Sequence, residues 1–118
     1  MRRMGLIVVT TTVSSRDDAL RLARALVEQR LAACAQVSAI DNCYRWDGAV
    51  CESPEFRLVL KSRDALYSAL EQAILALHPY ELPAIHAVPV CAAHGPYADW
   101  VLAETTAPSP DAGALRGA

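Results

Sequence analysis

Residues 44–51 read YRWDGAVC, and the Asp47-Gly48 pair at their centre decides how the fold of this chain is interpreted. Two-residue β-hairpin turns favour Asp-Gly, because both positions need a positive backbone φ that these residues tolerate. Runs rich in strand-forming residues lie on both sides of the pair. The pattern predicts a long β-hairpin over residues 33–61 that extends past the body of a small domain.

A two-residue turn also determines which side chains face each other along this hairpin. Trp46 would lie opposite Ala49, while Cys43 and Cys51 would point to opposite faces and could not form a disulfide. A three-residue loop would instead bring the two cysteines opposite each other, so their redox state depends on the turn. Pro54 has no N–H to donate to a neighbouring strand, and it therefore predicts a sheet edge or a bulge.

The residues before the hairpin predict a strand and a helix. Residues 5–12, GLIVVTTT, are β-branched and largely apolar, which is typical of a strand. Ser15 and Asp18 fit the capping pattern that begins a helix, and an amphipathic helix is expected to follow. Its expected apolar positions are Leu20, Ala23, Leu26, Val27 and Leu31.

A second helix is expected after the hairpin, beginning at Asp64. His78-Pro79 should end it, because the residue before a proline is disfavoured in the helical region. A strand over residues 84–90 and a short helix over 97–104 should follow. The expected apolar positions of the second helix are Leu66, Leu70, Ala73, Ile74 and Leu77.

This order of elements, β-α-β-β-α-β, indicates an α+β, ferredoxin-like fold with a long hairpin between its second and third strands and a short C-terminal helix. The first two helices would cover one face of an antiparallel sheet. Residues 1–105 are expected to form a single domain. Residues 106–118 are small and polar and are expected to form a disordered C-terminal tail.

Composition and charge exclude several kinds of partner. The 118 residues carry a formal net charge of -2, so the chain offers no basic surface for nucleic acid. No window approaches the ~18 apolar residues of a membrane span, and the short apolar run near the N-terminus does not fit a signal peptide. We therefore expect a cytoplasmic location with reduced cysteines. The four cysteines form no CxxC pair and predict neither a zinc knuckle nor a redox motif.

Several motifs together resemble the CutA family of divalent-cation tolerance proteins, over about residues 5–104. They are LAACAQV at 31–37, YRWDG at 44–48, Glu55, LKS at 60–62, HPYELPAI at 78–85 and YADW at 97–100. The resemblance implies a ferredoxin-like subunit and a homotrimer in which the 33–61 hairpin reaches a neighbouring subunit. It also implies a role in divalent-metal tolerance, copper binding, and a relation in architecture to the PII signalling trimers. It implies no enzymatic reaction.

The resemblance further implies metal ligands at three positions, namely a cysteine at the end of the first strand and two consecutive histidines before the proline. In this sequence Thr11, Leu77 and His78 stand at these positions, so only His78 matches. Imidazole suits copper, whereas threonine and leucine supply neither imidazole nor thiolate. His78 is therefore the candidate metal ligand, and the expected metal is Cu(II) or another divalent cation.

The residues around His78 also have a structural interpretation. A protonated histidine at a helix C-terminus is favoured by the helix dipole. Tyr80 and Glu81 could form a polar constellation with His78 in a cleft between subunits, or could serve as hydrogen bonds that fix the loop to a neighbour. Glu55, on the third strand, is expected to be solvated.

Tyr44 and Trp46 lie two residues apart, so they share one face of the predicted hairpin. Large aromatic side chains at an exposed hairpin tip indicate a partner surface, and a trimer contact is the interpretation that agrees with the resemblance.

Three classes of function are compatible with this fold. The first is a trimeric, non-enzymatic protein of divalent metal (copper) tolerance. The second is a PII-like trimer that binds a small anionic ligand and signals to an unidentified protein partner. The third, an acylphosphatase-type enzyme, is disfavoured because residues 10–18, TTTVSSRDD, contain no glycine and end in two acids.

Overall fold

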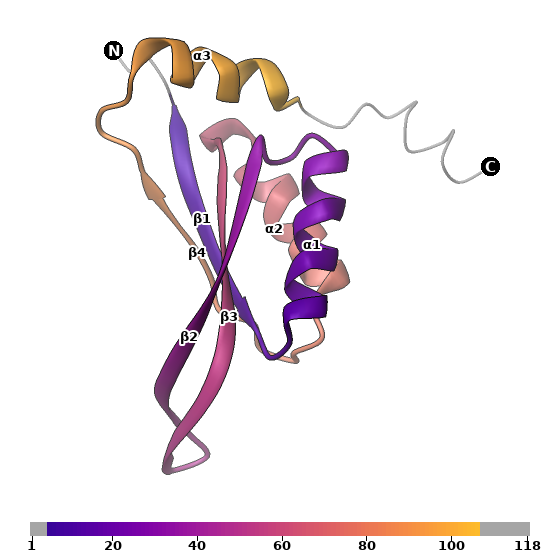
Figure 1. Ribbon diagram of the computed structural model, residues 1–118, viewed down its shortest axis with the longest axis vertical. Helices are drawn as coiled ribbons and strands as arrows, with labels where there is room; N and C mark the ends of the chain where they lie inside the picture. Colours follow the sequence, from indigo (N-terminus) through magenta and orange to yellow (C-terminus); the bar gives the residue numbers. More distant parts are fainter. Residues whose placement is uncertain (1–4, 107–118) are drawn as a thin grey trace, which may run out of the picture.

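The computed structural model describes residues 5–106 and shows a four-stranded antiparallel sheet in the order β2-β3-β1-β4. The helices α1 and α2 lie together on one side of this sheet (Figure 1). The elements are β1 (Leu6–Val13), α1 (Arg16–Glu28), β2 (Cys34–Trp46), β3 (Ala49–Arg63), a 3-10 turn (Asp64–Leu66), α2 (Tyr67–Leu77), β4 (Ile85–Pro89) and α3 (Gly95–Glu104). The predicted α+β, ferredoxin-like order with its appended helix is confirmed. The tail expected at 106–118 lies outside the described residues, except for residue 106.

The turn of the β2-β3 hairpin is the predicted two-residue turn. Trp46 pairs with Ala49, and Asp47 and Gly48 both have positive φ, at 51° and 79°. Both central residues of a type I′ turn need positive φ, and the twist of that turn matches the twist of the strands. All four cysteines are free thiols.

The hairpin extends beyond the body of the sheet (Figure 1). The pairing of β3 with β1 ends where Phe56 meets Val13, so residues 49–55 pair only with β2 in the described structure. Pro54 lies in this extension, opposite Asp41, with an uninterrupted register around it. The edge predicted from Pro54 is confirmed, and this extension carries the aromatic side chains of the hairpin.

The main core lies between the sheet and the two helices. Alternate residues of β1 and β3 point into it, among them Val9, Val13 and Leu58, all fully buried. Leu22 and Leu26 of α1 and Leu70 and Ile74 of α2 close the core from the helical side. The end of the sheet near Leu6 is covered by Ala98 and Val101 of α3.

The apolar face predicted for α1 was partly wrong. Leu20 and Val27 are 43% and 38% exposed, whereas Ala19 and Leu22 are buried. The helix begins at Arg16 and turns its buried stripe toward positions 19, 22, 23 and 26, so the side chains at 20 and 27 lie off that stripe. The helix also ends at Glu28, earlier than expected, and Leu31 enters the core after the turn.

Both helix boundaries next to the candidate site agree with the sequence. The Ser15 hydroxyl caps α1 by accepting a hydrogen bond from the Asp18 N–H at 3.1 Å. His78, which precedes Pro79, is extended with φ −76° and ψ 135°, so α2 ends at Leu77.

Among residues 5–106, no helix has the length and apolar character needed to cross a membrane.

Candidate functional site

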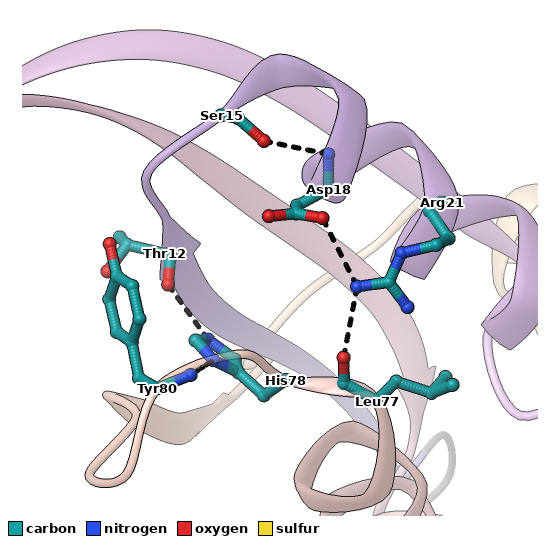
Figure 2. Close-up of polar contacts among 7 residues, drawn as sticks. All are labelled: Thr12, Ser15, Asp18, Arg21, Leu77, His78 and Tyr80. Carbon is teal, nitrogen blue, oxygen red and sulfur yellow. Dashed lines mark hydrogen bonds and ion pairs between the residues drawn. The ribbon is translucent and has the colours of Figure 1, made fainter.

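The side chain of His78 uses both ring nitrogens to hold the corner after α2. Its Nε2 lies 2.9 Å from the Thr12 carbonyl oxygen, and its Nδ1 lies 3.1 Å from the Tyr80 backbone nitrogen (Figure 2). A carbonyl can only accept and a backbone N–H can only donate, so Nε2 carries the proton and Nδ1 does not. The geometry therefore selects the neutral imidazole.

The electrostatics of His78 agree with this neutral form. Burial lowers the pKa of His78 below its usual value, and this effect outweighs the opposite influence of the Thr12 carbonyl and of the Asp18 and Glu55 carboxylates. The geometry and the burial therefore favour the neutral ring over the protonated imidazole expected at the C-terminus of α2. The structural role expected of His78 is present, but in the neutral form.

Arg21, rather than His78, provides the positive charge at the end of α2. Its Nη2 donates to the Leu77 carbonyl oxygen at 3.1 Å and contacts the Asp18 carboxylate at 3.3 Å (Figure 2). The last carbonyls of a helix have no partner within the helix, so this contact satisfies one of them. Arg21 thereby joins the first turns of α1 to the corner that contains His78.

Tyr80 and Glu55 connect the same corner to the hairpin. The Tyr80 hydroxyl donates to the Glu55 Oε2 at 2.7 Å, and the Asn42 side-chain amide donates to Oε1 of the same carboxylate. Burial and the hydrogen bond to Glu55 raise the pKa of Tyr80 to about 12. The solvated position expected for Glu55 is wrong, because the corner covers it and leaves it only 6% exposed. The hydrogen-bonding role expected of Tyr80 is present within one chain.

A cleft of about 610 Å³ lies between the hairpin extension and the loop after α2. It gathers Tyr44 and Trp46, which are 40% and 54% exposed, with Glu55 and the loop residues Tyr80 and Glu81. The rest of its lining is Thr12, Ser14, Asn42, Ser53, Pro54, Leu82 and Ala84. Of the predicted site residues, His78 does not line this cleft; its ring packs beside the Tyr80 ring, with centroids 4.9 Å apart.

The involvement of Asn42 and Glu55 was missed from the sequence. The two-residue turn places Asn42 opposite Ser53, and Glu55 follows Ser53 by two positions on the same strand. Alternate residues share a face, so Asn42, Tyr44, Trp46 and Glu55 could have been assigned to one face of the hairpin from the register alone.

The positions that the resemblance assigns to a metal do not form a copper site within one chain. Thr11 is fully buried, and its hydroxyl has no hydrogen-bond partner in the structure. Leu77 offers no ligand atom, and both nitrogens of His78 are already engaged. Within the described range, no group of three or more His, Cys, Asp or Glu side chains is arranged to hold a metal ion. The role of His78 as a ligand stays a prediction.

The fold and this corner define an α+β protein of ferredoxin-like topology whose long hairpin forms a cleft with the loop after α2. The family model described as CutA1 divalent ion tolerance protein matches residues 7–104. The chain therefore belongs to the CutA1 family of divalent ion tolerance proteins.

Individual relatives agree with this assignment. The chain is 40% identical over 99 residues to the divalent-cation tolerance protein CutA of Thermus thermophilus, covering 83% of this chain and 96% of that protein. The solved structure of CutA from Synechococcus elongatus superposes with a TM-score of 0.85 at 34% identity, covering 90% of this chain and 95% of the other. The chloroplastic CutA protein of Arabidopsis thaliana is 34% identical over 96 residues, covering 80% of this chain and 53% of that longer protein.

Proposed function

We propose that this protein acts in divalent-metal tolerance as a cytosolic homotrimer assembled through the 33–61 hairpin, and that copper is the metal it responds to. Membership of the CutA1 divalent ion tolerance family supports the tolerance role, as does the name of the Thermus thermophilus relative. The cytosolic assignment rests on the sequence alone. The chloroplastic name of the Arabidopsis thaliana relative places that protein in a different compartment.

The exposed aromatic face of the hairpin carries the trimer proposal. Tyr44 and Trp46 stand on an extension that no other strand of residues 5–106 covers. The sheet also ends in two unlike strands, β2 and β4, and Val88 on β4 is 50% exposed. Contacts between two unlike patches of identical chains generate a closed ring when the rotation closes. A ring of three copies would bury these aromatic and aliphatic side chains.

His78 is the residue we propose for the metal, as the only match to the ligand positions of the resemblance. Coordination through Nδ1 would require the Tyr80 N–H to move away, because that nitrogen now accepts its hydrogen bond. Further ligands would come from a neighbouring copy. Metal binding and loop movement are therefore coupled in this proposal.

Titration with Cu(II) tests the metal part, with His78→Ala compared against the wild type. His94→Ala is the matched control, because His94 is exposed and far from the corner in the chain. The proposal expects weaker copper binding for His78→Ala alone. Equal binding by all three proteins would remove His78 from the site.

A PII-like trimer that binds small ligands is the second candidate, and the size of the cleft favours it. Small-molecule sites in proteins commonly occupy about 300–1,000 Å³, a range that includes this cleft. The anionic ligand expected from the PII resemblance, however, would meet the carboxylates of Glu55 and Glu81.

A further inference from the structure

The three side chains proposed for the trimer contact belong to one face of the sheet. The helices α1 and α2 cover the other face (Figure 1), and α3 covers the end of this open face near Leu6. Side chains alternate between faces along a strand, and the pairing of the strands places Tyr44, Trp46 and Val88 on the open face. In a trimer formed through these residues, the open faces of the copies would therefore lie toward one another.

The open face also carries a basic patch, formed by Arg57, Lys61 and His86. Arg57 and Lys61 flank Val59 on β3, and His86 lies in the same row as Val59, with Thr10 between them. The side chains of Arg57 and His86 are exposed, and Lys61 is half-buried. Within residues 5–106, the side chains of Arg57 and Lys61 have no hydrogen-bond or ion-pair partner.

The strands supply no free carboxylate to balance this patch. Among the described strand residues of the open face, Glu55 is the only acid, and its oxygens accept hydrogen bonds from Tyr80 and Asn42. Bringing the copies together would take Arg57 and Lys61 out of water without a counter-charge. Such a burial is costly, because the hydration that is lost has to be replaced by a partner of opposite charge. An anion from solution would supply that partner.

The neighbours of the basic patch indicate which kind of anion fits. A guanidinium group matches the oxygens of phosphate in a fork, and an ammonium group adds a point charge. The hydroxyl-bearing residues Ser38 and Thr12 lie opposite Arg57 on the two adjacent strands. The residues paired with the patch across the sheet include no aromatic side chain on which a nucleotide base could stack.

We propose that the trimer binds a small inorganic oxyanion of the phosphate class between its open faces, held by Arg57 and Lys61 of more than one copy. The site is separate from the cleft beside the loop after α2, because neither residue lines that cleft. The inference rests on the homotrimer proposed above and does not depend on metal binding.

Calorimetric titration of the purified protein with inorganic phosphate tests the proposal. Sodium chloride keeps the ionic strength constant, so that general screening of charge is not measured as binding. We expect saturable binding of phosphate. Adenosine monophosphate carries the same group on a nucleoside and should bind more weakly, because the patch offers no surface for the base. Light scattering on the same samples reports the assembly state.

Substitutions of arginine provide the matched comparison. Arg57→Gln should weaken phosphate binding by about tenfold, the effect of losing one charge-assisted hydrogen bond. Arg57→Lys keeps the charge and should retain most of the affinity. Arg24→Gln on α1 is the control, because Arg24 lies on the helical side of the molecule and pairs with Glu28. Should Arg57→Gln disturb the assembly, Lys61→Gln provides the test.

Dependence on the assembly is tested with Trp46→Glu, which keeps Arg57 and Lys61 but places a charge in the proposed contact between copies. The dissociated variant should bind phosphate about tenfold more weakly, because each copy then offers only its own patch. Unchanged binding by the dissociated variant would contradict a site shared between copies.

The outcomes separate this proposal from the proposed assembly. A monomeric wild type would overturn both. A trimer without saturable phosphate binding would overturn the anion site alone and would indicate that Arg57 pairs with a carboxylate of another copy. Equal effects of Arg57→Gln and Arg24→Gln would also overturn it, as would tighter binding of adenosine monophosphate than of phosphate.

Discussion

The Tyr80 hydroxyl donates a hydrogen bond of 2.7 Å to the Glu55 carboxylate, which lies 25 residues earlier in the chain on the hairpin strand β3. This bond ties the loop after α2 to the part of the hairpin that extends beyond the sheet. His78 links the same loop to β1, because its Nε2 donates a hydrogen bond to the Thr12 carbonyl oxygen. One wall of the cleft therefore depends on a contact between two segments that are distant in sequence.

Replacing Tyr80 by Phe should reduce the free energy of unfolding by about 1.5–3 kcal/mol, the usual range for a hydrogen bond to a charged group. The substitution leaves a buried carboxylate with the Asn42 amide as its remaining described donor. Denaturation in guanidinium chloride measures the change. Tyr97→Phe on the exposed face of α3 is the control and should have almost no effect; equal losses would show that the Tyr80 bond contributes nothing specific.

The phenol of Tyr80 should titrate near pH 12, because its pKa is raised to about 12 from an ordinary value of 10. The folded state holds this proton more tightly than the unfolded state. The stabilising contribution is thus complete below pH 10 and is lost as the pH rises toward 12. The difference in ultraviolet absorbance between the wild type and Tyr80→Phe isolates this group. A difference spectrum with a midpoint near pH 10 would contradict the assigned burial and bond.

The lowered pKa of His78 predicts acid sensitivity of the fold. Below the ordinary histidine value of 6.5 the unfolded chain takes up a proton that folded His78 resists. Its contribution to stability is therefore complete above pH 6.5 and declines as the pH falls toward the folded pKa. Proton NMR of the histidine rings should show His78 titrating below the ordinary value of 6.5. A value above 6.5 would instead indicate the protonated imidazole favoured by a helix dipole.

Gly48→Ala should destabilise the hairpin by about 1 kcal/mol, because alanine disfavours the positive φ that this turn position requires. Gly48 has φ +79°, and an added Cβ would meet no atom within 4 Å, so the cost is conformational and not steric. Gly95→Ala is the control, since its Cβ is equally unobstructed and its φ lies outside the left-handed range. Chemical denaturation should show a loss for Gly48→Ala only. Equal changes in stability for the two variants would contradict the positive φ assigned to Gly48 in the turn.

Local sequence signals were sufficient to predict the order of the helices and strands and the main turns between them. The Asp47-Gly48 turn, the Ser15 cap and the stop at His78-Pro79 each act within a few residues, so their effects could be inferred from sequence. The register of the hairpin followed from the turn, because the side-chain period of a strand is two.

The errors arose where distant segments meet. The stripe of α1 could have included either Leu20 or Leu22, and only packing against the sheet selected Leu22. The burial of Glu55 depends on a loop that arrives 25 residues later. The bond from Arg21 to the Leu77 carbonyl joins two helices and leaves no local pattern.

Multi-angle light scattering of the purified protein tests the central claim of a trimeric CutA1 protein most directly. A homotrimer predicts a mass three times the chain mass of 12.7 kDa. Trp46→Glu should reduce that mass, because a charge would enter the proposed contact between copies. A wild-type mass of 12.7 kDa would contradict the assembly.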